Sequence, residues 1–457
     1  MNRKQSQSKL SRIKSLLILL FSLSALSLSS CSTQQLPNEF SRDHSAAEIQ
    51  TTRSTSHSQI AINGDDAFTP ANGVTGGNGT QADPYRISGW YINGYLGGVA
   101  IALSNTTKHV IIENNELSQS VIGIKLESAP NVTIRNNTIR DMKGWAGIFP
   151  AGNGDPAFGI YISSSNSVTI TGNNIYRIYG GAGAAGSMSL SNGGQGGQGG
   201  EAMAIFTYAS NNLSIAQNTL SYIYAGAPGA GAAGTLGAFG GDGGHGGDAS
   251  DSYGLRIISS NPLSVQSNSI SLVYGSAGAA GGTGAMGTIY GGNGGNGGKG
   301  GNAWGLNVTY SSNIVSSYNT MNDIWAGAGA AGAAGAVGTL YGGNGGNGGH
   351  AGHAYALYFG QSSTITSNSN QMTTIRGAAG AAGGMGALYY FYGLPFYAQG
   401  GNGGNGGNAF GLTMASSSPY TQTDNTFSSI IAGSGGLGAI SSGVNGTNGV
   451  ALNVKIQ

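Results

Sequence analysis

The residues that could carry acid–base chemistry are few in this 457-residue chain. Carboxylates occur near the start of its repetitive part, among them Glu113, Glu116 and Asp141, and then at scattered positions such as Glu201 and Asp251. Hydrolysis of a glycosidic bond needs a pair of carboxylates, and a calcium-dependent lyase needs an acidic cluster with a basic residue. Because these acids occupy mostly nonequivalent positions of the repeat, the sequence predicts a non-catalytic protein, not an enzyme.

A second set of residues could ligate a metal ion. Asp242, His245 and Asp248 are spaced three apart, as are His350 and His353. On an extended helix with three residues per turn, residues three apart lie about 9 Å from each other. All ligands of a zinc ion lie about 2 Å from it, so one such segment could not chelate the ion alone. We therefore expect no metal and no cofactor.

Cys31 is the only cysteine, so the chain can form no internal disulfide. Residues 1–30 combine a basic start with an apolar run at 16–28, the pattern of an export signal. The Leu-Ser-Ser-Cys sequence at 28–31 resembles the lipobox of bacterial lipoproteins, which implies lipid attachment at Cys31; a plain secretory signal is the alternative. Residues 31–57 are expected to be a flexible lipidated tether. The resemblance implies a lipid-anchored protein of the cell envelope, in the outer membrane or at the cell surface.

The amino-acid composition excludes several classes of protein. Glycine accounts for 86 residues and proline for only 10, which excludes collagen, because a triple helix needs both in abundance. Charged residues make up 8% and the formal net charge is +1, so no basic surface for nucleic acid is expected. Hydrophobic residues at 39% are too many for a solvated linker, and part of the chain should pack.

One internal repeat organises residues 58–457. A column of small residues recurs at spacings of 36 to 55, and an asparagine follows each of them after 14 positions. The small residues are Gly123, Gly159, Ala204, Gly254, Gly305, Ala356 and Gly411, and the asparagines are Asn137, Asn173, Asn218, Asn268, Asn319, Asn370 and Asn425. All variation in length lies between an asparagine and the next small residue. A block of constant length that alternates with a segment of variable length predicts a rigid stacked unit with a loop on one side.

The constant block contains three short apolar runs separated by turns. In its first copy the runs include Ile124, Val132 and Ile139. Alternation of apolar and polar residues indicates strands with one buried face. Three short strands per repeat predict an all-β fold, a single-stranded parallel β-helix of about eight coils. The asparagine column is expected to form a structural ladder of stacked amides rather than a ligand site.

Three segments carry a resemblance to the right-handed parallel β-helix superfamily, the pectin-lyase-like and NosD-like proteins. They are NVTIRNNTI at 131–139, SVTITGNNI at 167–175 and DPYRISGW at 83–90. The resemblance is strongest over 76–178 and implies right-handed coils. It concerns the fold and not the function, because the fold hosts lyases, hydrolases, adhesins and scaffolds.

The segments of variable length have glycine at every third position on the way out and a Gly-Gly-X repeat on the way back. They occupy about 143–158, 180–201, 225–249, 275–303, 326–354, 377–409 and 431–448. Period three matches a polyproline-II-like helix. We expect a lateral bundle of polyglycine-II helices joined by backbone hydrogen bonds, and a disordered linker is the alternative. The pattern resembles the bundles of snow-flea antifreeze protein and of phage tail-tip adhesins.

Aromatic residues gather where these hairpins turn. The predicted ligand contacts are Tyr389, Tyr390, Phe391, Tyr392, Phe396, Tyr397, Tyr290 and Tyr341. Exposed apolar patches mark interaction sites, and tyrosine supplies contact area with a hydroxyl at small entropic cost. The alternative is that these rings pack on one another as a small satellite core.

Together these features predict a lipid-anchored cell-surface protein whose arm tips adhere to or recognise a glycan or a protein. A structural envelope or matrix scaffold is the alternative. A polysaccharide-active β-helix enzyme and an ice-binding protein are lower alternatives. The expected partners are a membrane, through the lipid anchor, and a glycan or surface protein, with no nucleic acid.

Overall fold

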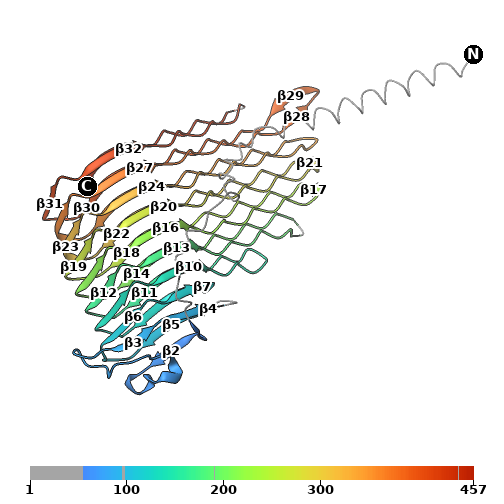
Figure 1. The fold of residues 1–457 in the computed structure, drawn as a ribbon. Helices are drawn as coiled ribbons and strands as arrows, with labels where there is room; N and C mark the ends of the chain where they lie inside the picture. The colour runs from blue at the N-terminus through green and yellow to red at the C-terminus, as the bar shows by residue number, and fades with distance from the viewer. Residues whose placement is uncertain (1–54, 95–97, 190, 441) are drawn as a thin grey trace, which may run out of the picture. The chain divides into compact units, whose positions relative to one another are not determined.

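The computed structural model describes residues 55–94, 98–189, 191–440 and 442–457. The predicted export signal, Cys31 and most of the predicted tether lie outside these residues. In the described part, parallel strands form three long sheets that run along a common axis (Figure 1). The helices there are two short 3-10 turns, η1 Asp65–Ala67 and η2 Pro70–Asn72. None of the described helices is long and apolar enough to span a membrane.

Each sheet takes one strand from every coil. Sheet A contains β1 Thr55–Ser56, β4 Trp90–Asn93, β7 Glu116–Ser118, β10 Thr138–Lys143, β13 Asn174–Tyr179, β16 Thr219–Tyr224, β20 Ser269–Tyr274, β24 Thr320–Trp325, β27 Gln371–Arg376 and β32 Thr426–Ile431. Sheet B contains β2 Ile60–Asn63, β5 Val99–Ser104, β8 Ile122–Glu127, β11 Ala157–Ser163, β14 Ala202–Tyr208, β18 Ser252–Ile258, β22 Ala303–Thr309, β25 Ala354–Gly360, β30 Ala409–Ala415 and β33 Ala451–Ile456. Sheet C contains β3 Tyr85–Ser88, β6 Val110–Glu113, β9 Val132–Arg135, β12 Val168–Thr171, β15 Leu213–Ala216, β19 Leu263–Gln266, β23 Ser312–Ser317, β26 Ser363–Asn368 and β31 Tyr420–Thr423.

The chain passes through sheets B, C and A in turn, and each circuit is one coil. Every strand pairs in parallel with its equivalents in the coils before and after, so that Leu255 lies opposite Ile205 and Leu306. The predicted all-β parallel β-helix is confirmed. Sheet C has nine strands, so the described residues make nine coils rather than about eight. The extra coil runs from β2 to β4. The segment 64–84 separates β2 from β3, so the constant spacing of the repeat cannot be recognised there in the sequence.

The interior of the coils is filled by the apolar columns of the sequence. Ile124, Ile134 and Ile139, one from each sheet, are completely buried. At the turn between sheets C and A, the backbone N–H and the side-chain Nδ2 of Asn137 both donate to Oδ1 of Asn173, each at 3.0 Å. Equivalent bonds run from Asn115 to Asn425. Buried polar groups are stable only when they are hydrogen-bonded, and this arrangement satisfies both donors.

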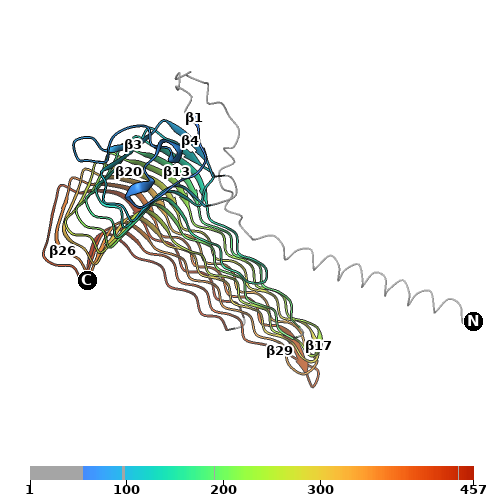
Figure 2. The same cartoon turned by 90° about the horizontal axis from the view of Figure 1, so that it is seen from below.

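From β10 onward, each connection from sheet A to sheet B extends far from the coils as a hairpin, which we call an arm. The arms lie side by side on the same side of the coils (Figure 2). Backbone hydrogen bonds join them, for example from Gly229 N to Gly197 O and from Gly282 N to Gly244 O, both at 2.8 Å. A Cβ atom on Gly247 would lie 2.2 Å from the carbonyl oxygen of Gly197. Glycine is therefore required where the backbones approach this closely.

The X residues of the Gly-Gly-X repeats bond the arms to one another. Oδ1 of Asp242 accepts from the backbone N–H of Asn293, and Oδ1 of Asn293 accepts from that of Asn344, at 2.7 and 2.8 Å. In the next row, Nδ1 of His245 accepts from the N–H of Asn296 at 2.9 Å. Asp, Asn and His all place an acceptor atom at the δ position of the side chain. This shared geometry explains why these three residue types recur at the position.

The two ends of the coil stack differ. The first coil is covered by the segment 64–84, whose Phe68 stacks on Tyr85 with ring centroids 4.5 Å apart. Phe68 and Val74 join the hydrophobic core, and Trp90 Nε1 donates to the carbonyl of Gly73 at 2.8 Å. At the other end, β31, β32 and β33 are the last strands of their sheets.

Candidate functional site

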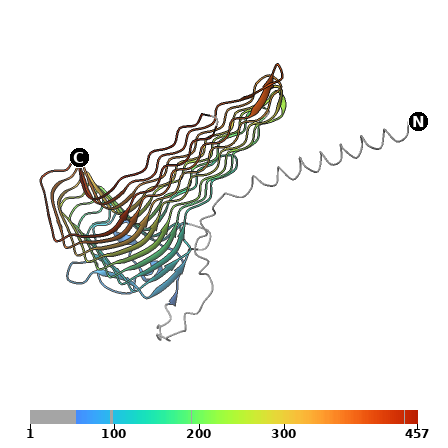
Figure 3. The same ribbon diagram turned by 90° about the horizontal axis from the view of Figure 1, so that it is seen from above.

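The arms extend far from the coils (Figure 3), and most of the predicted ligand contacts lie in short strands at the turns of these hairpins. Two strands in this region, β17 Gly237–Phe239 and β21 Gly287–Tyr290, pair in parallel, so that Phe239 lies opposite Tyr290. The longest arm ends in an antiparallel hairpin of β28 Leu388–Phe391 and β29 Leu394–Tyr397. We call these arm ends the tips.

Stacking of the arms aligns the aromatic rings of the tips. The ring centroids of Phe239 and Tyr290 lie 5.5 Å apart, and those of Tyr290 and Tyr341 lie 5.2 Å apart, with nearly parallel planes in both pairs. Tyr341 continues the row to Phe391 at 6.1 Å and to Tyr389 at 5.9 Å. These rings contact one another as the satellite-core alternative requires.

The same tips also expose a large apolar surface. Tyr392 is 91% exposed, Tyr397 66% and Tyr390 59%, and Phe239, in the row of stacked rings, is 66% exposed. Tyr389 and Phe391 are half-buried beneath them. The tips therefore combine a layer of contacting rings with an outer layer that faces solvent. Exposed groups of this kind mark interaction sites on soluble surfaces.

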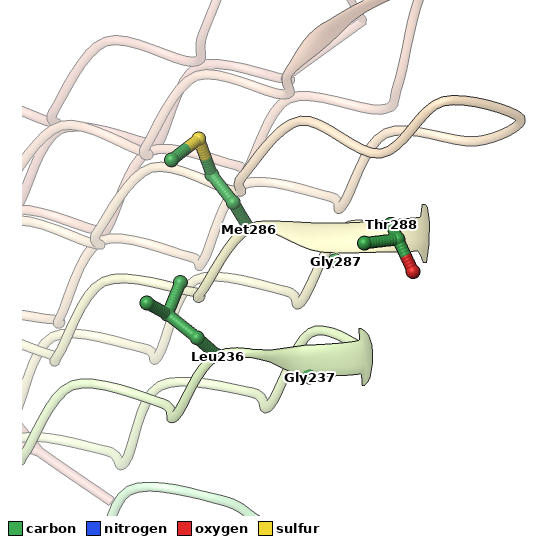
Figure 4. Close-up of a pocket in the computed structure, with 5 residues that line it drawn as sticks. All are labelled: Leu236, Gly237, Met286, Gly287 and Thr288. Atoms are coloured by element: carbon green, nitrogen blue, oxygen red, sulfur yellow. The ribbon is translucent and has the colours of Figure 1, made fainter.

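Aliphatic residues of the tips extend this surface, and Met286 among them was not predicted from the sequence. Leu236 and Met286, from neighbouring arms, point to the same side and line a shallow hollow with Gly237, Gly287 and Thr288 (Figure 4). Leu236 is 76% exposed and Met286 63%. The signal that could have found Met286 is the constant register between arms, which places it beside Leu236.

A second aromatic row lies on sheet B, where the arms return to the coils. Tyr253, Trp304 and Tyr355 occupy equivalent positions of β18, β22 and β25 and stack with planes 5° and 6° apart. The Trp304 and Tyr355 centroids are 4.0 Å apart. Arg256 lies over the Tyr253 ring at 4.7 Å. Burial raises the pKa of Tyr355 to about 12, so its hydroxyl stays protonated at neutral pH.

Two carboxylates meet beside this aromatic row. Glu201 and Asp251 directly precede β14 and β18, whose first residues lie opposite each other. Oδ2 of Asp251 accepts from Trp304 Nε1 and from the Tyr253 hydroxyl, both at 3.1 Å. Glu201 accepts from Arg256 at 3.1 Å, yet burial raises the pKa of the Glu201 carboxyl. A pair of acids with one raised pKa is an arrangement suited to general acid catalysis.

The acids near the start of the repeat are neutralised by arginines. Glu113 binds Arg86 at 2.9 Å and Arg135 at 2.6 Å. Burial alone would raise the pKa of Glu113, but the hydrogen bonds from the two arginines lower it overall. Asp141 similarly binds Arg140 and Arg177. These carboxylates stay ionised at neutral pH, so they are poor proton donors.

The histidines and aspartates of the arms do not form a metal cluster. Within the residues described, no three His, Cys, Asp or Glu side chains lie close enough together to hold one ion. Nδ1 of His245 and of His353 instead accept backbone hydrogen bonds from the following arm.

Comparison with known proteins identifies the family. The family model described as "Right handed beta helix region" matches residues 39–194 and 72–284, which together span more than half of the chain. The chain therefore belongs to the right-handed β-helix family, and the predicted handedness is confirmed. Among curated protein sequences no significant relative is found.

Solved structures share the fold at low similarity. The polygalacturonase from Erwinia carotovora ssp. carotovora is 12% identical, with 81% of this chain and 79% of that chain covered and a TM-score of 0.20. The Azotobacter vinelandii mannuronan C-5 epimerase AlgE6 A-module is 11% identical, with 81% and 90% covered and a TM-score of 0.15. The exopolygalacturonase from Thermotoga maritima is 8% identical, with 75% and 82% covered and a TM-score of 0.15. This likeness extends to the fold alone.

These comparisons correct the prediction that the protein is not an enzyme. That prediction is wrong as an exclusion, because the right-handed β-helix family to which the chain belongs gives no ground for excluding catalysis, and the structures named above are themselves enzymes. The error lay in treating the acids as nonequivalent, because Glu201 and Asp251 each directly precede a strand of sheet B and so occupy the same position of the repeat. Stacking of coils brings Glu201 beside Asp251 although 50 positions separate them.

Proposed function

We propose that this protein is lipid-anchored through Cys31 at the cell surface and that its arm tips recognise a glycan or another protein. The observation that carries the proposal is the outer layer of the tips, where Tyr392, Tyr397 and Tyr390 are each more than half exposed. Tyrosine offers a flat apolar ring for a sugar face or a protein side chain and a hydroxyl for a hydrogen bond. Solvent exposure of so many rings is otherwise unfavourable.

A rigid support for the tips favours recognition, because little flexibility is then lost on binding. We propose that the arms form a bundle of polyglycine-II helices. Support comes from the period-three glycines and from hydrogen bonds between arms, such as the 2.8 Å bond from Gly229 N to Gly197 O. The side-chain bonds of Asp242 and Asn293 add to them. Such a bundle would hold the tips in fixed register.

Glu201 and Asp251 support a second candidate, an enzyme that acts on a polysaccharide. The raised pKa of the Glu201 carboxyl suits a proton donor, while Asp251 is held by Trp304 and Tyr253. A stacked aromatic row beside the acids would offer a platform for sugar rings. The Glu201 side chain retains 37% exposure, which leaves it accessible to a ligand.

One experiment separates these candidates. The full chain is tested on a glycan array, on whole cells and for release of reducing or unsaturated sugar ends, beside Glu201→Gln and a tip variant with Tyr390, Tyr392 and Tyr397 changed to Ala. Binding lost only in the tip variant supports recognition by the tips. Sugar release lost only in Glu201→Gln supports the enzyme. If the tip variant binds as well as the parent chain, the tips act as part of a structural scaffold and the proposal fails.

A further inference from the structure

The last coil has an open end. β31, β32 and β33 each have a neighbouring strand on one side only among the described residues. Phe427, Ile430 and Val454 belong to the last coil and are only partly buried against the core. Equivalent residues of earlier coils are fully buried, such as Met372 at 1% exposure. The core therefore continues to the surface at this end.

The last arm, in contrast, lacks the side-chain acceptors that bond each earlier arm to the next one. The preceding arm has Asn402, Asn405 and Asn408 at these acceptor positions. The last arm has Val444, Thr447 and Val450 at the equivalent positions. Valine and threonine have no acceptor at the δ position, so no further arm could be bonded in the same way. Asn445 and Asn448 instead accept from backbone groups of their own arm, Gly438 and Gly435, at 2.8 Å.

The residues around this end, 420–440 and 442–457, form a nearly uncharged surface, which we call the terminal face and in which exposed aliphatic side chains alternate with Thr, Ser, Asn and Gln. Its exposed aliphatic side chains are Ile431, Leu437, Ile440, Val444, Val450, Leu452 and Ile456, at 41% to 97% exposure. One acid, Asp424, and one base, Lys455, are its only charged side chains. Natural sheets protect their edges with charges or covers, and an edge with few charges and no cover marks a pairing site.

We propose that the terminal face docks on the terminal face of a second copy of this chain, about a two-fold axis. The covered first coil, with Phe68 and Val74 over its core, blocks stacking of the last coil on the first coil of another copy. A two-fold axis that crosses sheet C instead places β31 antiparallel to its own copy, so that the free N–H and C=O groups of these two edge strands can pair. The charges are complementary, because Asp424 of either copy meets a surface whose one cation is Lys455.

The inference is tested with the full chain by sedimentation over a range of concentrations. The expected result is a dimer whose dissociation constant rises at least tenfold in the double variant Leu452→Lys, Ile456→Lys. Val315→Lys is the matched control, because Val315 is an exposed aliphatic residue, at 38%, in the middle of sheet C. It should leave the dimer unchanged. A parent chain that stays monomeric, or equal weakening by Val315→Lys, would overturn the proposal.

Cross-linking tests the orientation independently, in a Cys31→Ser background. Thr421→Cys on β31 should cross-link to the same residue of the partner, whereas Ala71→Cys on η2 should not form a homodimer. A mixture of the two variants that cross-links only between Thr421→Cys and Ala71→Cys would show stacking of the last coil on the first coil. That outcome would overturn the two-fold arrangement. Neither test depends on binding by the tips, so this inference and the proposed function can fail separately.

Discussion

Oδ1 of Asn347 accepts a hydrogen bond from the backbone N–H of Asn402, its equivalent in the next arm, at 2.8 Å. Asn347 in turn donates its own N–H to Oδ1 of Asn296 at the same distance. Each arm is thus bonded to the next by side chains as well as by backbone groups. Where the X position of the Gly-Gly-X repeat carries Asn, Asp or His, the δ acceptor makes the bond to the next arm, whereas Lys299, at the same kind of position, has no acceptor to offer.

Replacing Asn347 tests this requirement. Asn347→Leu should leave the Asn402 N–H without its partner and lower stability by about 0.5–1.5 kcal/mol, the usual net contribution of one hydrogen bond. Amide hydrogen exchange at Asn402 should accelerate. Asn347→Asp keeps the δ acceptor and should leave the exchange rate close to that of the parent. Equal acceleration in both variants would show that the acceptor atom is not what matters.

Close approach of the arms gives a second prediction. A Cβ atom at Gly295 would lie 2.0 Å from the carbonyl oxygen of Gly244, so Gly295→Ala should force the two arms apart. Hydrogen exchange should rise throughout both arms while the coil strands stay protected. Gly76→Ala is the control, because no atom lies within 4 Å of the added carbon. Unchanged hydrogen exchange in the Gly295→Ala variant would contradict the observed packing of the arms.

The sequence predicted the coils well because each strand repeats the same buried column, as Leu255 and Leu306 do. The tips were expected for a different reason, because they lie where the period-three glycine runs of each hairpin turn back. The sequence could not show which tip rings contact each other and which face solvent, since Tyr389 and Tyr390 are adjacent yet differ in burial. The placement of Glu201 beside Asp251 was missed although the repeat contains it, because each stands three positions before a member of the small-residue column, Ala204 and Gly254.

The asparagine ladder inside the coils should tolerate substitution far less than the asparagines of the arms do. Asn268 is 1% exposed, and its Oδ1 accepts from both the N–H and Nδ2 of Asn218 at 3.0 Å. Asn268→Leu strands these donors in the core, at about 1–3 kcal/mol for each unsatisfied group. Chemical denaturation should show a loss of several kcal/mol. Asn166→Leu, at an exposed turn, should cost much less, and a loss as large as that of Asn268→Leu would contradict the role of burial.

Acid should weaken the arms at His353. Its Nδ1 accepts from the N–H of Asn408 at 2.9 Å, which requires an unprotonated nitrogen. Burial, followed by the nearby charge of Lys455, lowers the pKa of His353 below its usual value of 6.5. The unfolded chain therefore binds the proton more readily, so this contribution to stability is complete above pH 6.5 and is lost as the pH falls through and below that value.

Unfolding measurements between pH 8 and pH 5 check this prediction. His353→Asn keeps a δ acceptor but does not titrate, so the part of the pH dependence that His353 causes should disappear in this variant. An unchanged pH dependence would show that His353 does not couple protonation to folding. NMR titration of the His353 ring should give a midpoint below 6.5 in the folded protein.

The central claim is that the tips bind a ligand, and affinity for that ligand tests it most directly. The dissociation constant for the best array or cell-surface ligand is measured for the full chain and for the variant with Tyr390, Tyr392 and Tyr397 changed to Ala. The control carries Tyr208→Ala and Tyr318→Ala, which remove exposed rings, at 48% and 63% exposure, from the coils. We predict at least tenfold weaker binding, about 1.4 kcal/mol, for the tip variant alone, with unchanged thermal unfolding. Equal affinity of the tip variant and the parent chain would contradict the account.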